Sequence, residues 1–513
     1  MAFNVDNKKI AKNTFFLYLR QILIMLIALY TSRVILNALG AEDYGIYSVV
    51  GGFVAMFNVI SGAFTVAISR FMQYVIGEGD EEKLERLFST ALVVQSATGL
   101  LICLLLATGG VWYVNNVMVL PVGRTQAALW VLLFSAITFF VKLISVPYDA
   151  LIVAHEQIAA YAYIAILEAG MKLGVALAIQ ISPFDKLISY GFLMLLAQVI
   201  VRACYSIYCK RHFTGCRFSL RIHRTMLQQM LTFVGWAFLG NGAGTLRDQG
   251  TTMIMNLFGG TIINAARGIA QNMNGAVSAF ANYFMQATQP QITKLWATGQ
   301  REEMRRLIYR SCRISYFLMA LICIPLIKNM DMVLHIWLGT TLDYTREFAI
   351  MTLVRIMITA LGNPLIYGVF AVGEIKVYEV CLSTLCILTL PVSYLLLSVG
   401  LSPVSVYLLQ VVFEFLILLL LIWQSKTYGL TFGAFIVQVG ARVVLVTVFC
   451  VVIAMFTNLS IIPFELLRFV LESGIIVVLN AMIILFFGFT TQERTKLIAT
   501  VLAKFKKSAS HGM

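Results

Sequence analysis

Hydrophobic residues recur along the chain in blocks of about 20, separated by short polar stretches. A helix of that length crosses a bilayer core of about 30 Å. Because backbone groups in lipid must be paired within their own segment, such blocks predict helices rather than open sheets. The pattern predicts about fourteen transmembrane helices, at 14–38, 46–70, 88–113, 126–146, 157–180, 187–208, 229–258, 262–288, 310–327, 346–371, 377–398, 403–424, 432–456 and 465–488.

Composition agrees with a membrane protein, and the position of the charges predicts its orientation. Of the 513 residues, 60% are hydrophobic and only 12% are charged, whereas a soluble chain carries roughly a quarter charged residues. The net charge of +14 lies mostly in alternate loops. The opposite loops hold only Arg124, Lys186, Lys328 and Arg346. This asymmetry predicts that both termini lie in the cytoplasm. It is no nucleic-acid signal, because no basic face carries base-reading groups.

An internal repeat runs through the chain. The loop at 79–88 aligns with the loop at 299–308, and the segment 37–40 aligns with 256–259. Pro147 and Pro364 also match, and each copy follows the other by about 220 residues. Helices one to six therefore correspond to seven to twelve. Since each repeat has an even number of spans, both halves share one orientation. We expect two six-helix lobes around a central cavity, plus two extra C-terminal helices.

The repeat and the charge pattern predict five regions. These are an N-terminal six-helix lobe at 1–209, a basic cytoplasmic linker at 210–228, a C-terminal six-helix lobe at 229–425, helices thirteen and fourteen at 426–489, and a basic cytoplasmic tail at 490–513.

A polar stripe follows helix eight. Its members recur at spacings of three and four, which places them on one helix face, and they are Asn264, Arg267, Gln271, Asn274, Ser278, Asn282, Gln286 and Gln289. Asn58 lies on a similar face of helix two, and Asn241 and Asp248 lie on one face of helix seven. Such stripes face either a hydrated cavity or a neighbouring helix held by amide hydrogen bonds. Both interpretations stay open at this point.

Arginine exceeds acid in the helices that line the expected cavity. Arg20 and Arg33 lie in helix one, Arg247 in helix seven and Arg267 in helix eight, against the single acid Asp248. A membrane-centre arginine costs at least about 2.5–3.5 kcal/mol, so each needs a reason. We do not expect Arg247 to pair with Asp248, because neighbours in sequence point in different directions on a helix. The surplus indicates an anionic substrate. The candidate binding residues are Arg20, Arg33, Arg247, Arg267, Gln271, Asn274, Asn58 and Asn241.

Three further charged groups are candidates for coupling to an ion. Glu168 and Lys172 stand four residues apart in helix five, in the order that favours an internal ion pair. They form either that neutralising pair or, together with Asp248, a coupling site. The Cys and His residues at 209–223 match no common zinc spacing, so we predict no metal. We expect no cofactor, because the sequence has no Walker A loop, dinucleotide fingerprint or nucleophile elbow.

Three short segments resemble one transporter family. They are 39–47 (LGAEDYGIY), 69–71 (SRF) with the loop at 79–88, and 335–339 (HIWLG). In order and spacing they resemble the polysaccharide flippases, of the O-antigen (Wzx-type) kind, in the multidrug/oligosaccharidyl-lipid/polysaccharide exporter superfamily. The resemblance covers nearly the whole chain and implies two six-helix lobes that work by alternating access. Drug exporters of the superfamily usually place acids in helix one, whereas helix one of this chain has none.

The resemblance implies a transporter rather than an enzyme, in a bacterial inner membrane. Its expected substrate is a polyprenyl-pyrophosphate-linked oligosaccharide, such as an O-antigen or capsule unit for polysaccharide or lipopolysaccharide biosynthesis. Expected partners are that lipid-linked oligosaccharide, membrane lipids and a polysaccharide polymerase or other export machinery, with no nucleic acid. The alternatives are a cation-coupled multidrug or solute exporter and a membrane polysaccharide polymerase or glycosyltransferase. The second alternative is weaker, because the loops are short and mainly basic.

The charge asymmetry makes topology directly testable. Reporter fusions after Ser425 and at Met513 should report a cytoplasmic position, and a fusion within 329–344 should report an external one, because lysine and arginine stay on the cytoplasmic side. Paired phosphatase and fluorescent-protein reporters at each position measure this. An external C-terminus would contradict the fourteen-helix prediction.

Overall fold

The computed structural model describes residues 7–58, 60, 61, 64, 68, 71, 72, 75, 76, 79–155, 157–213, 215, 216, 224–339, 342–373, 376–459, 462–489 and 493–495. Within these ranges, side chains are described except at 7–22, 158, 159, 224–241, 282–284, 286, 287, 290 and 297. Every regular element in the described ranges is a helix, as the hydrophobic blocks predict.

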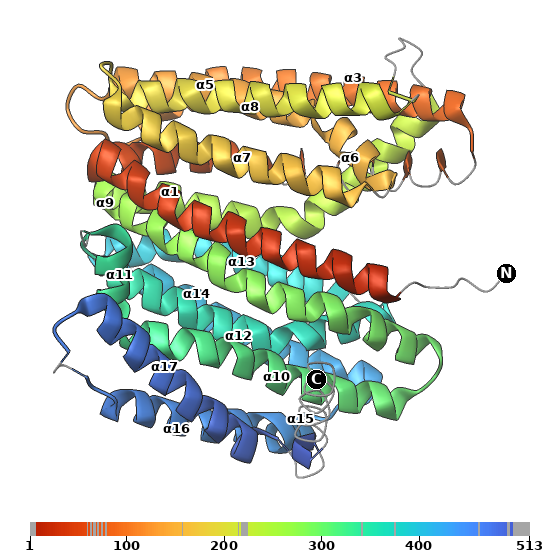
Figure 1. Cartoon of the computed structure of the whole chain (residues 1–513), viewed down its shortest axis with the longest axis vertical. Helices are drawn as coiled ribbons and strands as arrows, with labels where there is room; N and C mark the ends of the chain where they lie inside the picture. The colour runs from red at the N-terminus through yellow and green to blue at the C-terminus, as the bar shows by residue number, and fades with distance from the viewer. Residues whose placement is uncertain are drawn as a thin grey trace, which may run out of the picture. The chain divides into compact units, whose positions relative to one another are not determined.

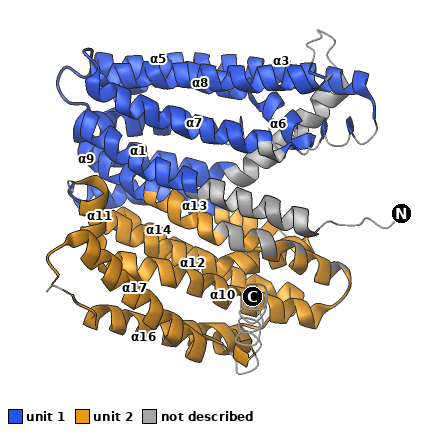
Figure 2. Cartoon of the chain, viewed as in Figure 1, with its two compact units in different colours: residues 1–272, 342–344, 383–405 blue, residues 273–341, 345–382, 406–513 orange. Residues whose placement is uncertain are grey.

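Packing divides the chain into two compact units (Figure 2): residues 1–272, 342–344 and 383–405 form unit 1, and the remainder forms unit 2. The predicted lobes rest on the internal repeat rather than on packing, so their boundaries stay a prediction. The helices of the first half of the chain are α1 (Asn7–Ala55), α3 (Glu81–Leu105), η1 (Leu106–Gly110), α4 (Val111–Asn116), α5 (Thr125–Leu143), α6 (Val146–Ala154), α7 (Ile158–Ala178), η2 (Ile179–Ile181), α8 (Lys186–His212) and α9 (Arg224–Ala297).

The second half continues with α10 (Arg301–Lys328), α11 (Met330–Leu338), α12 (Thr345–Val372), α13 (Lys376–Ser398), α14 (Val404–Gln424), η3 (Ser425–Tyr428), α15 (Phe432–Phe435), η4 (Ile436–Gly440), α16 (Ala441–Phe456), α17 (Glu465–Ile483) and η5 (Ile484–Gly488). In the described residues, eleven helices are long and apolar enough to cross a membrane. The all-helical fold class is confirmed, and the count of fourteen spans stays a prediction.

Two glycines break the two longest helices. Gly40 interrupts α1 with φ 77° and ψ 171°, and Gly260 interrupts α9 with φ 64° and ψ −162°. Glycine adopts these angles without the steric penalty that a Cβ atom brings. Each break falls between two predicted spans. Helix α1 contains the predicted span 14–38 and the start of 46–70, and α9 contains the spans 229–258 and 262–288.

The internal repeat is visible in the backbone. Gly40 and Gly260 lie 220 residues apart, and so do Gly79 and Gly299, which both have positive φ. The helices that follow also begin in step, since α3 and α10 start 220 residues apart, as do α5 and α12. The same offset in sequence therefore places the same backbone breaks in both halves.

Unit 1 is a layer of long helices that run side by side. Helix α5 packs against α3 and α8, and α7 packs against α8 and α1 (Figure 1). One end is fixed by Arg124, which forms ion pairs with Asp43 of α1 and with Asp185, the residue that caps α8. Partial burial alone would raise the pKa of Asp185. Hydrogen bonds from Arg124 and from the N–H groups of Ile188 and Leu187 outweigh it, and the pKa lies below its usual value.

In unit 2, α10 packs against α12, α16 and α17. Arg313 of α10 is only 4% exposed. Its guanidinium donates to Glu493 at 2.6 Å and to the carbonyl of Gln438 at 3.1 Å. Tyr316 and Thr447 share a further hydrogen bond of 2.8 Å. Polar contacts thus attach the C-terminal helices to α10 and satisfy a charge that would otherwise be costly to bury.

Helix α9 has two arms, one before and one after the break at Gly260. Close backbone contact joins α1 to the second arm within unit 1. A Cβ atom added to Gly45 would lie 2.0 Å from the carbonyl oxygen of Thr261. A side chain at Gly268 would likewise meet Ser48. Glycine at these positions allows the two helix backbones to approach closely, as small residues do in other membrane helices.

Gly45→Ala should therefore destabilise the protein. The added methyl group meets backbone rather than a mobile side chain, so we expect a loss of about 1–3 kcal/mol, typical of overpacking. Thermal unfolding of the purified protein in detergent measures it. Gly51→Ala is the matched control on the same helix, because nothing lies within 4 Å of its added Cβ. Equal melting temperatures for the two variants would refute the close-packing interpretation.

Candidate functional site

Unit 1 contains a cavity of 450 Å³ among α1, α7, α8 and the second arm of α9. This volume is within the range of small-molecule sites, about 300–1,000 Å³. The lining residues are Ile24, Ile27, Ala28, Thr31, Ser32, Ile35, Tyr44, Tyr47, Ala165, Glu168, Ala169, Lys172, Tyr190, Met194 and Asn272. Aliphatic side chains from α1 and α7 therefore share the wall with hydroxyl, amide and charged groups.

Three tyrosines and an asparagine form one polar part of the wall. The Asn272 amide donates to the Tyr44 hydroxyl at 3.0 Å. The rings of Tyr47 and Tyr190 meet edge to face, with centroids 4.8 Å apart. Tyr44 and Tyr190 are buried, whereas Tyr47 is half-buried. A tyrosine offers both an apolar ring and a polar hydroxyl, so this wall can contact a ligand that has both characters.

The predicted ion pair between Glu168 and Lys172 is confirmed. The Lys172 ammonium lies 2.6 Å from the carboxylate, and the two side chains are 47% and 34% exposed. Both residues line the cavity. At this exposure the pair adds little stability. A coupling role for the two residues stays a prediction.

Arg267 is held inside α9. It is 1% exposed. Its Nη2 donates to the carbonyl of Asp248 at 2.7 Å, and its Nε donates to the Thr252 hydroxyl at 2.9 Å. Both acceptors precede the break at Gly260, so Arg267 ties the two arms of α9 together. In this conformation the guanidinium is a structural link, and its role in substrate binding stays a prediction.

Arg247 and Asp248 do form an ion pair, so our expectation for these neighbours was wrong. The Arg247 Nε lies 3.0 Å from Oδ1 of Asp248. Long side chains bend enough to bridge adjacent helix positions. The same guanidinium also contacts the Cys386 sulfur of α13 at 3.7 Å. Part of the arginine surplus is therefore neutralised within unit 1.

The other predicted binding residues are spread over several environments. Arg33, Gln271 and Asn274 are half-buried, and Asn274 accepts a hydrogen bond from Ser278. The side-chain oxygen of Asn58 accepts a hydrogen bond from Lys142 at 3.0 Å. The side chains of Arg20 and Asn241 lie outside the described residues. Of the nine predicted binding and coupling residues whose side chains are described, only Glu168 and Lys172 line the 450 Å³ cavity.

The polar stripe of helix eight divides into two parts. Asn264 and Arg267 are buried, and Asn264 donates to the carbonyl of Gly260 at 3.3 Å. Further along, Gln271 and Asn274 are accessible in part. The first part of the stripe therefore bonds within the helix pair, and access of the second part to ligand or water stays a prediction.

The sequence pattern did not predict the part of the cavity wall formed by three tyrosines and Asn272. Asn272 lies one position beside the predicted stripe, and Tyr190 lies in a mainly apolar predicted helix. Tyr44 and Tyr47 carried a signal, since they stand three residues apart and so share a helix face. Both lie in the segment 39–47, which resembles a family motif.

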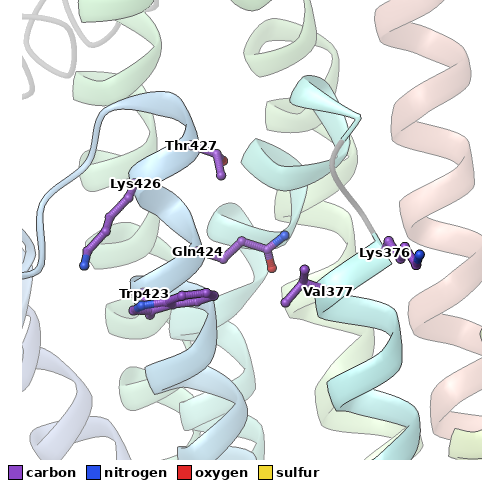
Figure 3. Close-up of a pocket in the computed structure, with 6 residues that line it drawn as sticks. All are labelled: Lys376, Val377, Trp423, Gln424, Lys426 and Thr427. Atoms are coloured by element: carbon purple, nitrogen blue, oxygen red, sulfur yellow. The ribbon is translucent and has the colours of Figure 1, made fainter.

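A second cavity, of 520 Å³, lies in unit 2 between the start of α13 and the end of α14. Figure 3 shows the Trp423 ring and the Gln424 amide facing Val377, while Lys426 points away from them. Its two lysines, Lys376 and Lys426, do not converge on one point (Figure 3). The described side chains include no group of three or more His, Cys, Asp or Glu that could hold a metal.

No family model matches the sequence, and no curated protein matches it. Solved structures do match. One is described as lipid II flippase MurJ in an inward closed conformation, with TM-score 0.70 and 10% identity, over 92% of this chain and 98% of that chain. A multidrug resistance MATE family transporter of the MOP superfamily, inward-facing, has TM-score 0.65 and 11% identity, over 79% of this chain and 94% of that chain.

A third similar structure is a MOP superfamily transporter from Pyrococcus furiosus, described as having a binding pocket of reverse polarity. It has TM-score 0.60 and 13% identity, over 81% of this chain and 95% of that chain. At such identities the likeness shows the fold alone. The chain is a multi-pass membrane protein with the fold of MOP-superfamily transporters, as the family resemblance implied.

The accessible part of the helix-eight stripe can be tested by labelling. Single cysteines at Gln271 and Asn274 should react with a water-soluble thiol reagent in intact membranes, because these positions are half-buried beside polar groups. Cysteines at Ile269 and Val277, which are 0% and 6% exposed, should react at least about tenfold more slowly. The experiment measures labelling rates in a background without native cysteines. Equal protection at all four positions would mean that the whole stripe is packed and dry.

Proposed function

We propose that this chain moves a polyprenyl-pyrophosphate-linked oligosaccharide from the inner to the outer leaflet of a bacterial inner membrane by alternating access. The observation that carries the proposal is the extent of the fold likeness. A lipid II flippase superposes on 92% of the chain, whereas the inward-facing multidrug transporter superposes on 79%. The absence of acids from helix one and the motifs at 39–47 and 335–339 support the same proposal.

The proposed substrate contacts come from arginine and amide groups. Arg20 and Arg33 of α1 are the candidates for the pyrophosphate, because guanidinium binds phosphate oxygens through two parallel hydrogen bonds. Arg247 and Arg267 would join them only after their contacts with Asp248 and Thr252 open. Gln271, Asn274, Asn58 and Asn241 would form hydrogen bonds with the hydrated glycan.

The driving force is proposed to be electrical and ionic. With the cell interior negative, moving an anion outward gains about 2.3 kcal/mol per charge per 100 mV. Asp248, Glu168 and Lys172 are the candidate coupling residues, and two of them line the cavity of unit 1. We propose no cofactor and no enzymatic step. The proposed partners are the lipid-linked oligosaccharide, membrane lipids and the polymerase or export machinery that takes up the glycan.

The second candidate function is cation-coupled export of drugs or other solutes. It rests on the likeness to the multidrug transporter, whose TM-score of 0.65 is close to that of the flippase. A polymerase or glycosyltransferase has less support, because the described chain consists of helices joined by short connections. The Asp248 carboxylate and the Glu168–Lys172 pair would serve an exporter as well as a flippase.

Loss of the chain should separate these functions. In its native cell, deletion should abolish a surface polysaccharide and cause its lipid-linked precursor to accumulate in the cytoplasmic leaflet, because synthesis continues while flipping stops. Surface glycan staining and mass spectrometry of extracted lipids measure both effects. Efflux of fluorescent cations is measured in the same strains.

Arginine variants refine the same experiment. Arg33→Ala should reduce surface glycan about tenfold or more. Arg33→Lys should restore it in part, because lysine keeps the positive charge but lacks the two parallel N–H donors of the guanidinium. Membrane insertion of each variant is checked by immunoblotting. Normal export with Arg33, Arg247 and Arg267 all replaced by Ala would refute an anionic substrate. Reduced cation efflux with unchanged surface glycan would favour the exporter.

A further inference from the structure

The described lining of the unit 1 cavity does not suit a pyrophosphate. Within the described part of the chain, the lining residues include one cation, Lys172, and one anion, Glu168. These two neutralise each other at 2.6 Å. Phosphate sites need cationic or N–H donors in excess over acceptors. The remaining polar lining consists of hydroxyl and amide groups, which are uncharged and both donate and accept hydrogen bonds.

One hydroxyl in the wall lacks a hydrogen-bond partner. Thr31 lines the cavity and is only 7% exposed. Its Oγ1 has no partner in the described part of the chain. Leaving a buried hydroxyl without a hydrogen bond is costly, so such groups usually have a role. A ligand hydroxyl in the cavity would supply the missing hydrogen bond.

The aromatic wall is suited to a ring with apolar and polar faces. Tyr47 and Tyr190 present ring surface, and the Asn272–Tyr44 hydrogen bond presents an amide and a hydroxyl. A sugar ring has C–H groups on its faces and hydroxyl groups around its edge. The C–H faces of such a ring would pack on the aromatic rings, and its hydroxyls would bond to Thr31, Tyr44 and Asn272.

We infer that this cavity is a subsite for a neutral sugar ring of the transported glycan, separate from the groups that hold the pyrophosphate. The inference rests on the proposed function, and it assigns sugar selection to Thr31, Tyr47, Tyr190 and Asn272. The aliphatic side chains of α1 beside these groups offer further apolar surface to the C–H faces of the ring.

Binding to the full chain in lipid nanodiscs tests this. The probes are a bare polyprenyl pyrophosphate and the same lipid carrying one hexose or one N-acetylhexosamine. In the wild type, one sugar-bearing probe should bind at least about tenfold more tightly than the bare lipid. Thr31→Val keeps the shape and removes the hydroxyl. It should reduce that preference about fivefold while leaving affinity for the bare lipid unchanged.

Filling the cavity gives a matched pair of variants. Ala169 is buried and lines the cavity, so Ala169→Trp should remove the preference for the sugar-bearing lipid. Leu167 lies on the same helix, is 41% exposed and does not line the cavity, so Leu167→Trp should keep the preference. Tyr47→Phe retains the ring and should keep most of the preference, whereas Tyr47→Leu should lose it.

Two results would overturn the subsite. One is equal affinity of the wild type for bare and sugar-bearing lipids, and the other is a preference that survives Ala169→Trp. Failure of the proposed function gives a different result, because a chain that transports no lipid-linked substrate would bind none of the three probes above background.

Discussion

Every charge that enters the apolar interior of this protein must find its partner within the chain. Lipid offers no hydrogen bonds, and an isolated guanidinium in it costs several kcal/mol. Arg267 therefore bonds to the Asp248 carbonyl and the Thr252 hydroxyl. Arg313 bonds to Glu493 and a backbone carbonyl. The Arg267 contacts join the two arms of α9, and the Arg313 contacts join α10 to C-terminal segments that are distant in sequence. The need to satisfy charge thus also constrains how the helices pack.

This constraint separates structural arginines from those that remain accessible to substrate. A guanidinium with several internal acceptors gains nothing from a phosphate until those contacts open. Arg33 of α1 is half-buried, whereas Arg267 is buried. The described lining of the unit 1 cavity, by contrast, has no net charge, because Glu168 and Lys172 form an ion pair and the tyrosines are uncharged. Charge recognition and sugar recognition are thus proposed for different side chains, which would let one fold carry different glycans on a common lipid carrier.

Glycine provides the second constraint, by setting where helices break and how closely they pack. The breaks at Gly40 and Gly260 recur at the repeat offset, and so do the positive-φ glycines at Gly79 and Gly299. Residues with a Cβ atom rarely adopt these backbone angles, so each of these positions requires glycine. The contact of Gly45 with Thr261 brings two of the broken helices together in unit 1.

The sequence by itself determined the helical class, the membrane location and the repeat, and it offered the Glu168–Lys172 ion pair as one of two alternatives. Each of these follows from local pattern, because hydrophobic length, loop charge and i,i+4 spacing act over one helix or one turn. It did not determine which arginines are enclosed, that Arg247 bends to Asp248, or that Tyr44, Tyr47, Tyr190 and Asn272 surround one cavity. Those outcomes depend on which helix faces meet and on the conformation of long side chains. Only the tertiary structure decided them, because a polar helix face has the same sequence pattern whether it contacts water, a ligand or another helix.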